Sequence, residues 1–360
     1  MTKAPIQSGS RCLADRLATG VVLGDGGYLL ELEHRGYVQA GPFTPEVVLQ
    51  HPEALHQLHV EFARAGADVL QALTFYADDR MPGSSAWSVS EVNRQAVALA
   101  REAAGDDLMV AGTLTQTVGF KPRQRELAAR ATRTFAWQLE AQCQAGVDLV
   151  IAETFRFLAE ARLALAAINA AGLPAMITLN LGPAGTGDGA SAGESARVLG
   201  GEGAAVVGVN CNWDPTVSLA IAREMLAAAP AGVAVACQPV GYRTSDPAVP
   251  FVSMPEFPLG LEPLQLGRHH LARFARDGAD AGIAYIGGCC GVQPYHVRAM
   301  AEALGRTPSA SAKSPDLSSH VLPEVRDRAA GNQAFGDPDS DEIRSGAPVG
   351  GDPRALRKRG

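Results

Sequence analysis

Three of the six cysteines stand where short apolar runs end. Cys211 follows the run at 204–209, and the adjacent pair Cys289 and Cys290 follows the run at 283–286. Thiolates are soft ligands that suit Zn²⁺, and three protein ligands leave the fourth tetrahedral position open, as catalytic zinc sites do. The glycines on both sides of the pair give the backbone the freedom to turn both sulfurs toward one ion. Buried, inert cysteines are the alternative interpretation of the same pattern.

The other cysteines, Cys12, Cys143 and Cys237, show no such arrangement, and we assign them ordinary structural positions. Six cysteines in 360 residues are too few for a disulfide scaffold, and a strain-free bridge between two adjacent cysteines is improbable. Clustered thiols in a reducing compartment more often bind metal or take part in chemistry.

Eight short apolar runs predict the strands that position these cysteines, at residues 20–23, 68–74, 108–113, 148–152, 174–179, 204–209, 233–236 and 283–286. Amphipathic stretches at 51–65, 90–104 and 125–145 predict helices between them. Ala-Gly pairs at 65–66, 145–146, 171–172 and 281–282 each stand just before a predicted strand, where glycine suits the left-handed position after a helix. This alternation over about 300 residues predicts an α/β fold, a (β/α)₈ TIM barrel, whose strand C-termini carry the reactive groups. A doubly wound open sheet alternates in the same way and is the alternative.

Composition excludes several classes of function. The net charge of −7 gives no basic surface for nucleic acid or for an anionic membrane. We find neither an apolar run long enough to span a membrane nor an apolar leader, so we expect a cytoplasmic protein. After about residue 306 the chain becomes rich in Ser, Pro and Gly. We therefore expect residues 1–306 to form one catalytic barrel domain and residues 307–360 to form an extended C-terminal arm or tail, partly disordered.

The cysteine motifs resemble those of a known family. Residues 208–215 (GVNCNWDP) and 285–296 (YIGGCCGVQPYH) are similar to the zinc motifs of the homocysteine S-methyltransferases, and in particular of their betaine–homocysteine branch. Residues 24–46, 74–77, 151–154 and 255–263 resemble the same branch, so the resemblance runs from about residue 18 to 306. It favours the barrel over the open sheet, and it implies Zn²⁺ on Cys211, Cys289 and Cys290.

The resemblance also implies a reaction. A free thiol has a pKa of about 8.5 and is mostly protonated at neutral pH, whereas zinc coordination deprotonates it. The sulfur of homocysteine would take the open fourth position and attack the methyl carbon of a small onium donor, giving methionine. The reaction implies homocysteine and a betaine-like donor as partners. The resemblance also implies a homo-oligomer, a dimer or tetramer.

Two carboxylates match the family positions that hold the amino-acid end of homocysteine. Asp25 stands in the first βα turn and Glu153 at the end of the fourth strand, and a carboxylate is the expected partner of an ammonium group. The backbone N–H groups around Gly26 and Gly27 would meet the carboxylate of the substrate. Without the resemblance, an ordinary turn residue is the alternative interpretation of Asp25, and a solvated strand end is that of Glu153.

The donor site departs from the betaine branch. That branch surrounds the quaternary ammonium with one Trp and two Tyr, through cation–π attraction, where this chain has Phe43, Tyr76 and Thr154. His320 matches a histidine that the branch places near the donor carboxylate. Ordinary packing for the two rings, and a solvated tail for His320, are the alternatives. Because Thr154 is too short to approach zinc as the matching Tyr does, we expect another group to fill the resting fourth position.

Several alternatives stay open at this point. The donor could instead be a dimethylsulfonium compound, another N-methylated onium or S-methylmethionine, and the barrel could bind zinc without catalysis. A methyl-folate donor and a zinc hydrolase are disfavoured, because neither a folate module nor a suitable general base is visible. We expect Gln71, Asn210 and Gln238 to lie near the site, and His59 and Glu61 to face solvent on a helix.

Overall fold

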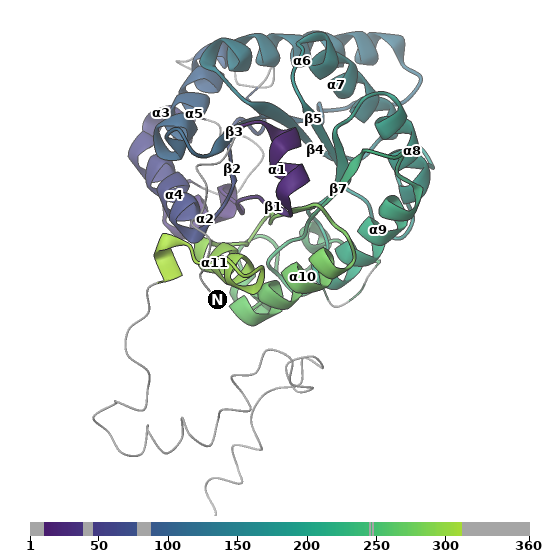
Figure 1. Cartoon of the computed structure of the whole chain (residues 1–360). Helices are drawn as coiled ribbons and strands as arrows, with labels where there is room; N and C mark the ends of the chain where they lie inside the picture. Colours follow the sequence, from purple (N-terminus) through teal and green to yellow (C-terminus); the bar gives the residue numbers. More distant parts are fainter. Residues whose placement is uncertain (1–10, 39–45, 78–87, 245, 247, 312–360) are drawn as a thin grey trace, which may run out of the picture.

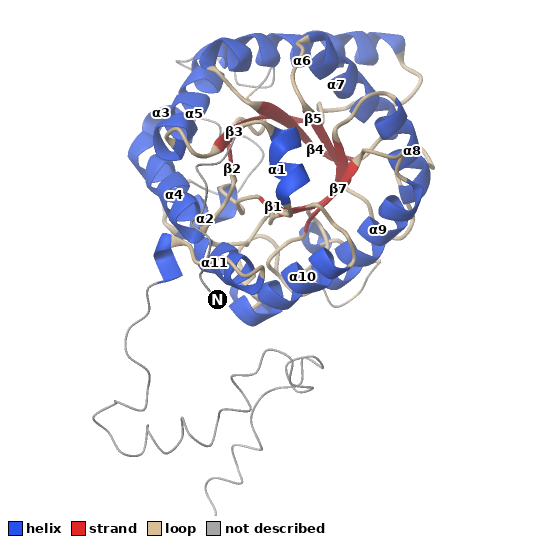
Figure 2. Cartoon of the chain, in the orientation of Figure 1, coloured by secondary structure: helices blue, strands red, loops and turns tan. Residues whose placement is uncertain are grey.

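The computed structural model describes residues 11–38, 46–77, 88–244, 246 and 248–311 (Figure 1). Eight parallel strands hydrogen-bond in the order β1-β8-β7-β6-β5-β4-β3-β2, and helices form a ring outside them (Figure 2). The strands are β1 (Val22–Leu23), β2 (Val69–Gln71), β3 (Met109–Thr115), β4 (Leu149–Phe155), β5 (Ala175–Leu179), β6 (Val206–Asn210), β7 (Ala234–Gln238) and β8 (Tyr285–Ile286). All eight predicted strands are confirmed, and the fold is the TIM barrel rather than the open sheet.

Apart from the first and the last, the helices connect successive strands on the outside of the barrel. They are α1 (Leu13–Thr19), α2 (Leu29–His34), α3 (Val47–Gln50), α4 (Pro52–Ala65), α5 (Val89–Ala104), α6 (Arg125–Ala145), α7 (Leu158–Ala170), α8 (Ala192–Gly201), α9 (Pro215–Ala228), α10 (Arg268–Asp280) and α11 (Pro294–Ala303). Short 3₁₀ turns lie at Phe251–Ser253, Glu262–Leu264 and Ser309–Ser311. The glycines expected after four of these helices all have positive φ, between 72° and 104°.

Asp68 joins the two strands at the ends of this order. Its backbone N–H donates to Leu23 O at 2.7 Å, and its carboxylate accepts from Leu23 N at 2.8 Å. Arg16 and Arg306 pair with the same carboxylate at 3.0 and 2.8 Å. The seam between β1 and β2 is therefore closed by one side chain together with backbone.

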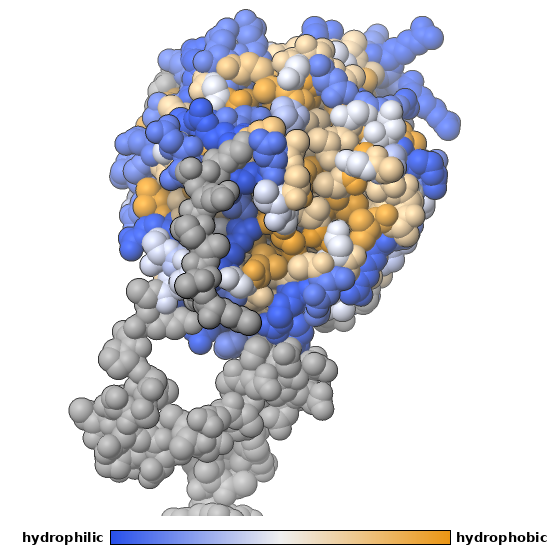
Figure 3. All heavy atoms as spheres, viewed as in Figure 1, coloured by the Kyte–Doolittle hydropathy of each residue, from blue (hydrophilic) through white to orange (hydrophobic). Residues whose placement is uncertain are grey.

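Opposite ends of the barrel serve different purposes. Helix α1 lies across the N-terminal mouth in Figure 1, and its Leu13 packs with Val22, Val69 and other strand residues inside the barrel. Figure 3 shows this face with polar residues along much of the rim and hydrophobic ones gathered on the side of α8 and α9. None of the helices in the described part of the chain has the length and apolar character that crossing a membrane requires.

The C-terminal mouth carries the predicted site residues. At the end of β4 the pairing with β5 shifts register between Ala152 and Phe155, so Glu153 and Thr154 form an irregularity in the strand. Irregularities of this kind re-aim side chains, often beside active sites. Thr154 has a φ of 64°, a backbone region that non-glycine residues rarely adopt.

Candidate active site

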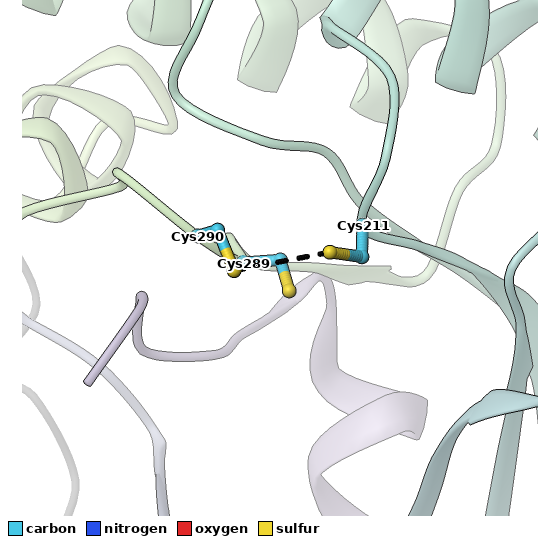
Figure 4. A group of neighbouring side chains, drawn as sticks. All are labelled: Cys211, Cys289 and Cys290. Carbon is cyan, nitrogen blue, oxygen red and sulfur yellow. Dashed lines mark hydrogen bonds between the residues drawn. The ribbon is translucent and has the colours of Figure 1, made fainter. Parts of the chain in front are cut away.

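The sulfurs of Cys211, Cys289 and Cys290 converge at the C-terminal mouth, and all three Sγ atoms lie within 4.8 Å of one another. Cys211 reaches the cluster from the end of β6, while the adjacent pair follows β8 (Figure 4). The Sγ atoms of Cys211 and Cys290 are 3.9 Å apart. Tetrahedral zinc with Zn–S bonds of about 2.3 Å holds neighbouring sulfurs about 3.8 Å apart, so the three thiols fit a zinc ion.

Local backbone geometry turns Cys211 toward the pair. Cys211 and Asn212 have φ values of 63° and 60°, and such strain in non-glycine residues is typical of functional sites. The backbone N–H of Cys211 donates to Gln238 O at 2.9 Å, which fixes the turn. The first βα turn also approaches the pair closely, because a Cβ on Gly27 would lie 2.7 Å from Cys289 O.

The thiols need a cation to ionise together. The pKa of Cys289 is well above that of an ordinary thiol, first because of its hydrogen bond with Cys211, and further because of burial and the charge of Cys211. A divalent metal compensates this cost, since coordination favours the thiolate form outright. The donor set and its spacing therefore support the zinc site that the sequence predicts.

A pocket of about 100 Å³ opens beside the cysteines. Among its lining residues are the three cysteines and three residues that the sequence singled out, Gly26, Glu153 and Thr154. The C-terminal ends of β2 and β4 and the turns that follow β1, β2, β6 and β8 thus meet around one cavity. This arrangement places a candidate amino-acid site directly against the candidate metal.

Glu153 is accessible from this pocket and enclosed by protein elsewhere. Gln71 Nε2 donates to its Oε1 at 2.7 Å, and Asn210 Nδ2 donates to its Oε2 at 3.0 Å. Burial raises the pKa of Glu153 to about 7, against the lowering effect of the Gln71 bond. Both amides orient the carboxylate without neutralising it.

Asp25 lies behind the pocket wall. Its side chain is 1% exposed, and its Oδ2 accepts hydrogen bonds from the Tyr28 hydroxyl and, at 2.7 Å, from Gln71 N. Burial raises the pKa of Asp25 to about 7, although the Tyr28 bond acts in the opposite direction. Asp25 is not among the described residues that line the pocket, whereas Tyr28 and Gln71 are. A bound ammonium would favour the charged forms of both carboxylates.

The donor residues are only partly covered by the structure. Thr154 lines the pocket, and its Oγ1 accepts from Asn210 Nδ2 at 2.8 Å. Tyr76 is half-buried with a φ of 62°, and its ring packs on Phe75 with centroids 4.3 Å apart. Phe75 lines the pocket, and Tyr76 does not appear among the described lining residues. Phe43 and His320 lie outside the described residues, so their roles stay predictions.

One expectation about helix α4 is wrong. His59, expected to face solvent, is fully buried, and its Nδ1 lies 2.9 Å from the Tyr28 hydroxyl. Leu55, His59 and Phe62 follow helical spacing along the buried face of α4, and this apolar spacing was the signal that could have placed the histidine. Glu61 on the same helix is partly exposed and pairs with Arg35 at 2.6 Å, as a solvated residue would.

Comparison with known proteins gives the same family as the site. The family model for homocysteine S-methyltransferase matches residues 22–304. Betaine–homocysteine S-methyltransferase 1 of Mus musculus is 42% identical over 337 residues, covering 88% of this chain and 82% of the relative. An S-methylmethionine–homocysteine S-methyltransferase of Pongo abelii is 41% identical over 344 residues, covering 91% and 93%.

A solved structure supports the fold independently. The oxidized form of the homocysteine methyltransferase MmuM from Escherichia coli aligns with a TM-score of 0.64 at 19% identity, covering 78% of this chain and 95% of that one. A likeness at this low identity shows the fold alone. The more similar relatives and the matched family model show the family. With its three converging cysteines, this chain belongs to the homocysteine S-methyltransferase family.

Proposed function

We propose that this homocysteine methyltransferase takes its methyl group from betaine or a betaine-like onium compound and yields methionine. The observation that carries the proposal is the convergence of three thiols beside a pocket lined by Glu153. The identity to betaine–homocysteine methyltransferases supports the choice of donor.

Each residue contributes a defined part of this reaction. Cys211, Cys289 and Cys290 would hold zinc, and a bound zinc ion would supply the positive charge that lowers the pKa of the homocysteine thiol, so that its proton is released to solvent and its sulfur is nucleophilic. Glu153 and, behind the wall, Asp25 supply the negative charge that attracts the ammonium group of homocysteine. The backbone N–H of Gly26 would meet the substrate carboxylate, whereas that of Gly27 already donates to Val292 O at 2.9 Å.

S-Methylmethionine is the second candidate donor, and two observations favour it. Thr154 stands where the betaine branch has a tyrosine, so one face of the expected aromatic enclosure is missing. In addition, a relative named for S-methylmethionine is as similar to this chain as those named for betaine. A sulfonium donor also gives up its methyl group more readily than a quaternary ammonium, because the thioether that departs is a better leaving group than a tertiary amine.

A donor panel tests the proposal. The zinc-loaded protein is given homocysteine with glycine betaine, dimethylsulfoniopropionate, proline betaine or S-methylmethionine, and methionine is measured. We expect the greatest kcat/KM with glycine betaine or a betaine-like compound. A clear preference for S-methylmethionine would establish the second candidate. No methionine from any donor, with zinc bound, would leave a non-catalytic zinc-binding barrel.

Two further parts of the proposal concern the protein as a whole. We expect a homo-oligomer, a dimer or tetramer, to be measured by light scattering on the full chain. We also expect the protein to reside in the cytoplasm, where a three-thiol metal site stays reduced. Fractionation of the source cells would test that location.

A further inference from the structure

A buried chain of hydrogen bonds runs from Asp25 into the helical layer. Tyr28 is 7% exposed, and its hydroxyl lies between Asp25 Oδ2 and His59 Nδ1, 2.9 Å from the latter. Because the hydroxyl has a single proton and donates it in the hydrogen bond to Asp25, its oxygen accepts a hydrogen bond from the protonated Nδ1 of His59. The three groups therefore form one directed chain, from imidazole to phenol to carboxylate.

The second nitrogen of His59 is consistent with this direction. Nε2 is buried and has no hydrogen-bond partner among the described residues. With the proton on Nδ1, Nε2 carries none that would need an acceptor, so the cost of burial is reduced. Burial lowers the pKa of His59 to about 3, which keeps the ring uncharged.

Packing fixes the phenol ring in place. The ring centroids of Tyr28 and His59 are 4.8 Å apart, and those of Tyr28 and Phe62 are 5.3 Å apart in an edge-on arrangement. His59 and Phe62 both belong to α4, so this helix holds Tyr28 against the pocket wall. The position of the hydroxyl is thus set by the scaffold rather than by a mobile side chain.

We propose that Tyr28, fixed by His59, is a positioning residue that sets the affinity of the site for the ammonium group of homocysteine by holding the Asp25 carboxylate. The inference rests on the proposed role of Asp25 in attracting that group. The bonds from Tyr28 and from Gln71 N both end on Oδ2, which fixes the plane of the carboxylate. The Tyr28 bond is also the largest effect that opposes the rise of the Asp25 pKa on burial.

The test compares two thiols that differ only in the ammonium group. Homocysteine and 4-mercaptobutanoate are titrated by calorimetry into the zinc-loaded full chain and its Tyr28→Phe variant. We expect the variant to bind homocysteine about tenfold more weakly, as for the loss of one hydrogen bond to a charged group. Binding of 4-mercaptobutanoate should change by less than about twofold, and kcat at saturating homocysteine should stay within the same range.

Two further sets of variants separate positioning from packing. Tyr295→Phe removes a hydroxyl from a tyrosine that is 39% exposed on α11, and it should leave both affinities unchanged. His59→Leu should weaken homocysteine binding about threefold, whereas His59→Asn, which places an amide donor near the position of Nδ1, should restore most of it.

The outcomes distinguish this inference from the function on which it rests. Equal weakening of both thiols by Tyr28→Phe would show a packing role and overturn the inference. Unchanged affinity of Tyr28→Phe for both thiols would overturn it as well, while leaving the ammonium site intact. A wild-type protein that binds both thiols equally would overturn the ammonium site itself, and the inference with it.

Discussion

Asn210 donates its side-chain amide to Glu153 Oε2 at 3.0 Å. The same nitrogen lies 3.9 Å from Cys289 Sγ, and the next residue in the chain is the metal ligand Cys211. A shift at the end of β6 would therefore move Cys211 together with Glu153, the carboxylate that we propose for the substrate ammonium group. The zinc end and the amino-acid end of the site are built as one hydrogen-bonded unit.

The Asn210→Ala variant should disturb both ends of this unit. It removes the bond to Glu153 and two bonds to Thr154, at the backbone N–H (2.9 Å) and at Oγ1 (2.8 Å). We expect a loss of about 2–3 kcal/mol in the free energy of unfolding, because a buried backbone donor is left without a partner. We expect kcat/KM to fall at least about tenfold, and a variant that lost stability but kept kcat/KM would contradict the coupling.

Removing one thiol should remove the metal. Cys290→Ser replaces a soft ligand by a hydroxyl, and we expect zinc content to fall well below one per chain and activity to fall more than about a hundredfold. Cys143→Ser, at an exposed position on α6, is the matched control and should keep both. The measurement is elemental analysis after gel filtration, together with methionine formation. Full zinc content in Cys290→Ser would rule out that residue as a ligand.

Neutralising Glu153 should weaken homocysteine binding more than it slows turnover. Glu153→Gln removes the charge that faces the pocket and leaves a side chain of similar shape. We expect KM for homocysteine to rise about thirtyfold, or about 2 kcal/mol, within the range for a hydrogen bond to a charged group. Glu61→Gln, which affects the ion pair with Arg35 and a hydrogen bond from Gln57 away from the pocket, should leave KM unchanged. An unchanged KM in Glu153→Gln would place the ammonium elsewhere.

The fold was largely predictable from the sequence because its signals are local. Eight apolar runs and the glycines after the helices mark each βα unit, and each unit appears in the structure. The zinc site was predictable for a related reason, since both cysteine segments follow strands whose C-terminal ends share one mouth of the barrel. The parallel topology places both cysteine segments at that mouth, and a correct assignment of the strands is enough to predict it.

Contacts across the barrel were not predictable in the same way. That Asp25 lies behind Tyr28 rather than on the pocket wall depends on the packing of the first turn against α4. The apolar spacing of α4 could have placed His59 on the buried face, but that its partner there is the Tyr28 hydroxyl could not be predicted from that spacing. Such pairings lie 31 residues apart and leave no periodic signal.

Stability without metal should fall as pH rises. The pKa values of Asp25 and Glu153 are each raised to about 7 by burial, from ordinary values near 4. The folded chain therefore keeps protons that the unfolded chain has lost, so the stability from these groups is full below about pH 4 and is lost as pH rises to about 7. Urea unfolding of the metal-free protein between pH 5 and 8 should show this decline. Glu153→Gln should show a shallower one, and identical slopes would contradict the assignment.

Cobalt substitution should report the fourth metal position directly. Thr154 Oγ1 is engaged by Asn210, so we expect the resting position to be filled by water or another small group rather than by this side chain. Homocysteine should then add a fourth sulfur to the three cysteines and increase the sulfur-to-cobalt charge-transfer absorption, because thiolates bind more strongly than the group they displace. Homoserine, which has a hydroxyl in place of the thiol, should leave that absorption unchanged. A cobalt spectrum that ignored homocysteine would contradict the thiol as a metal ligand, even if the metal content and the fold were intact.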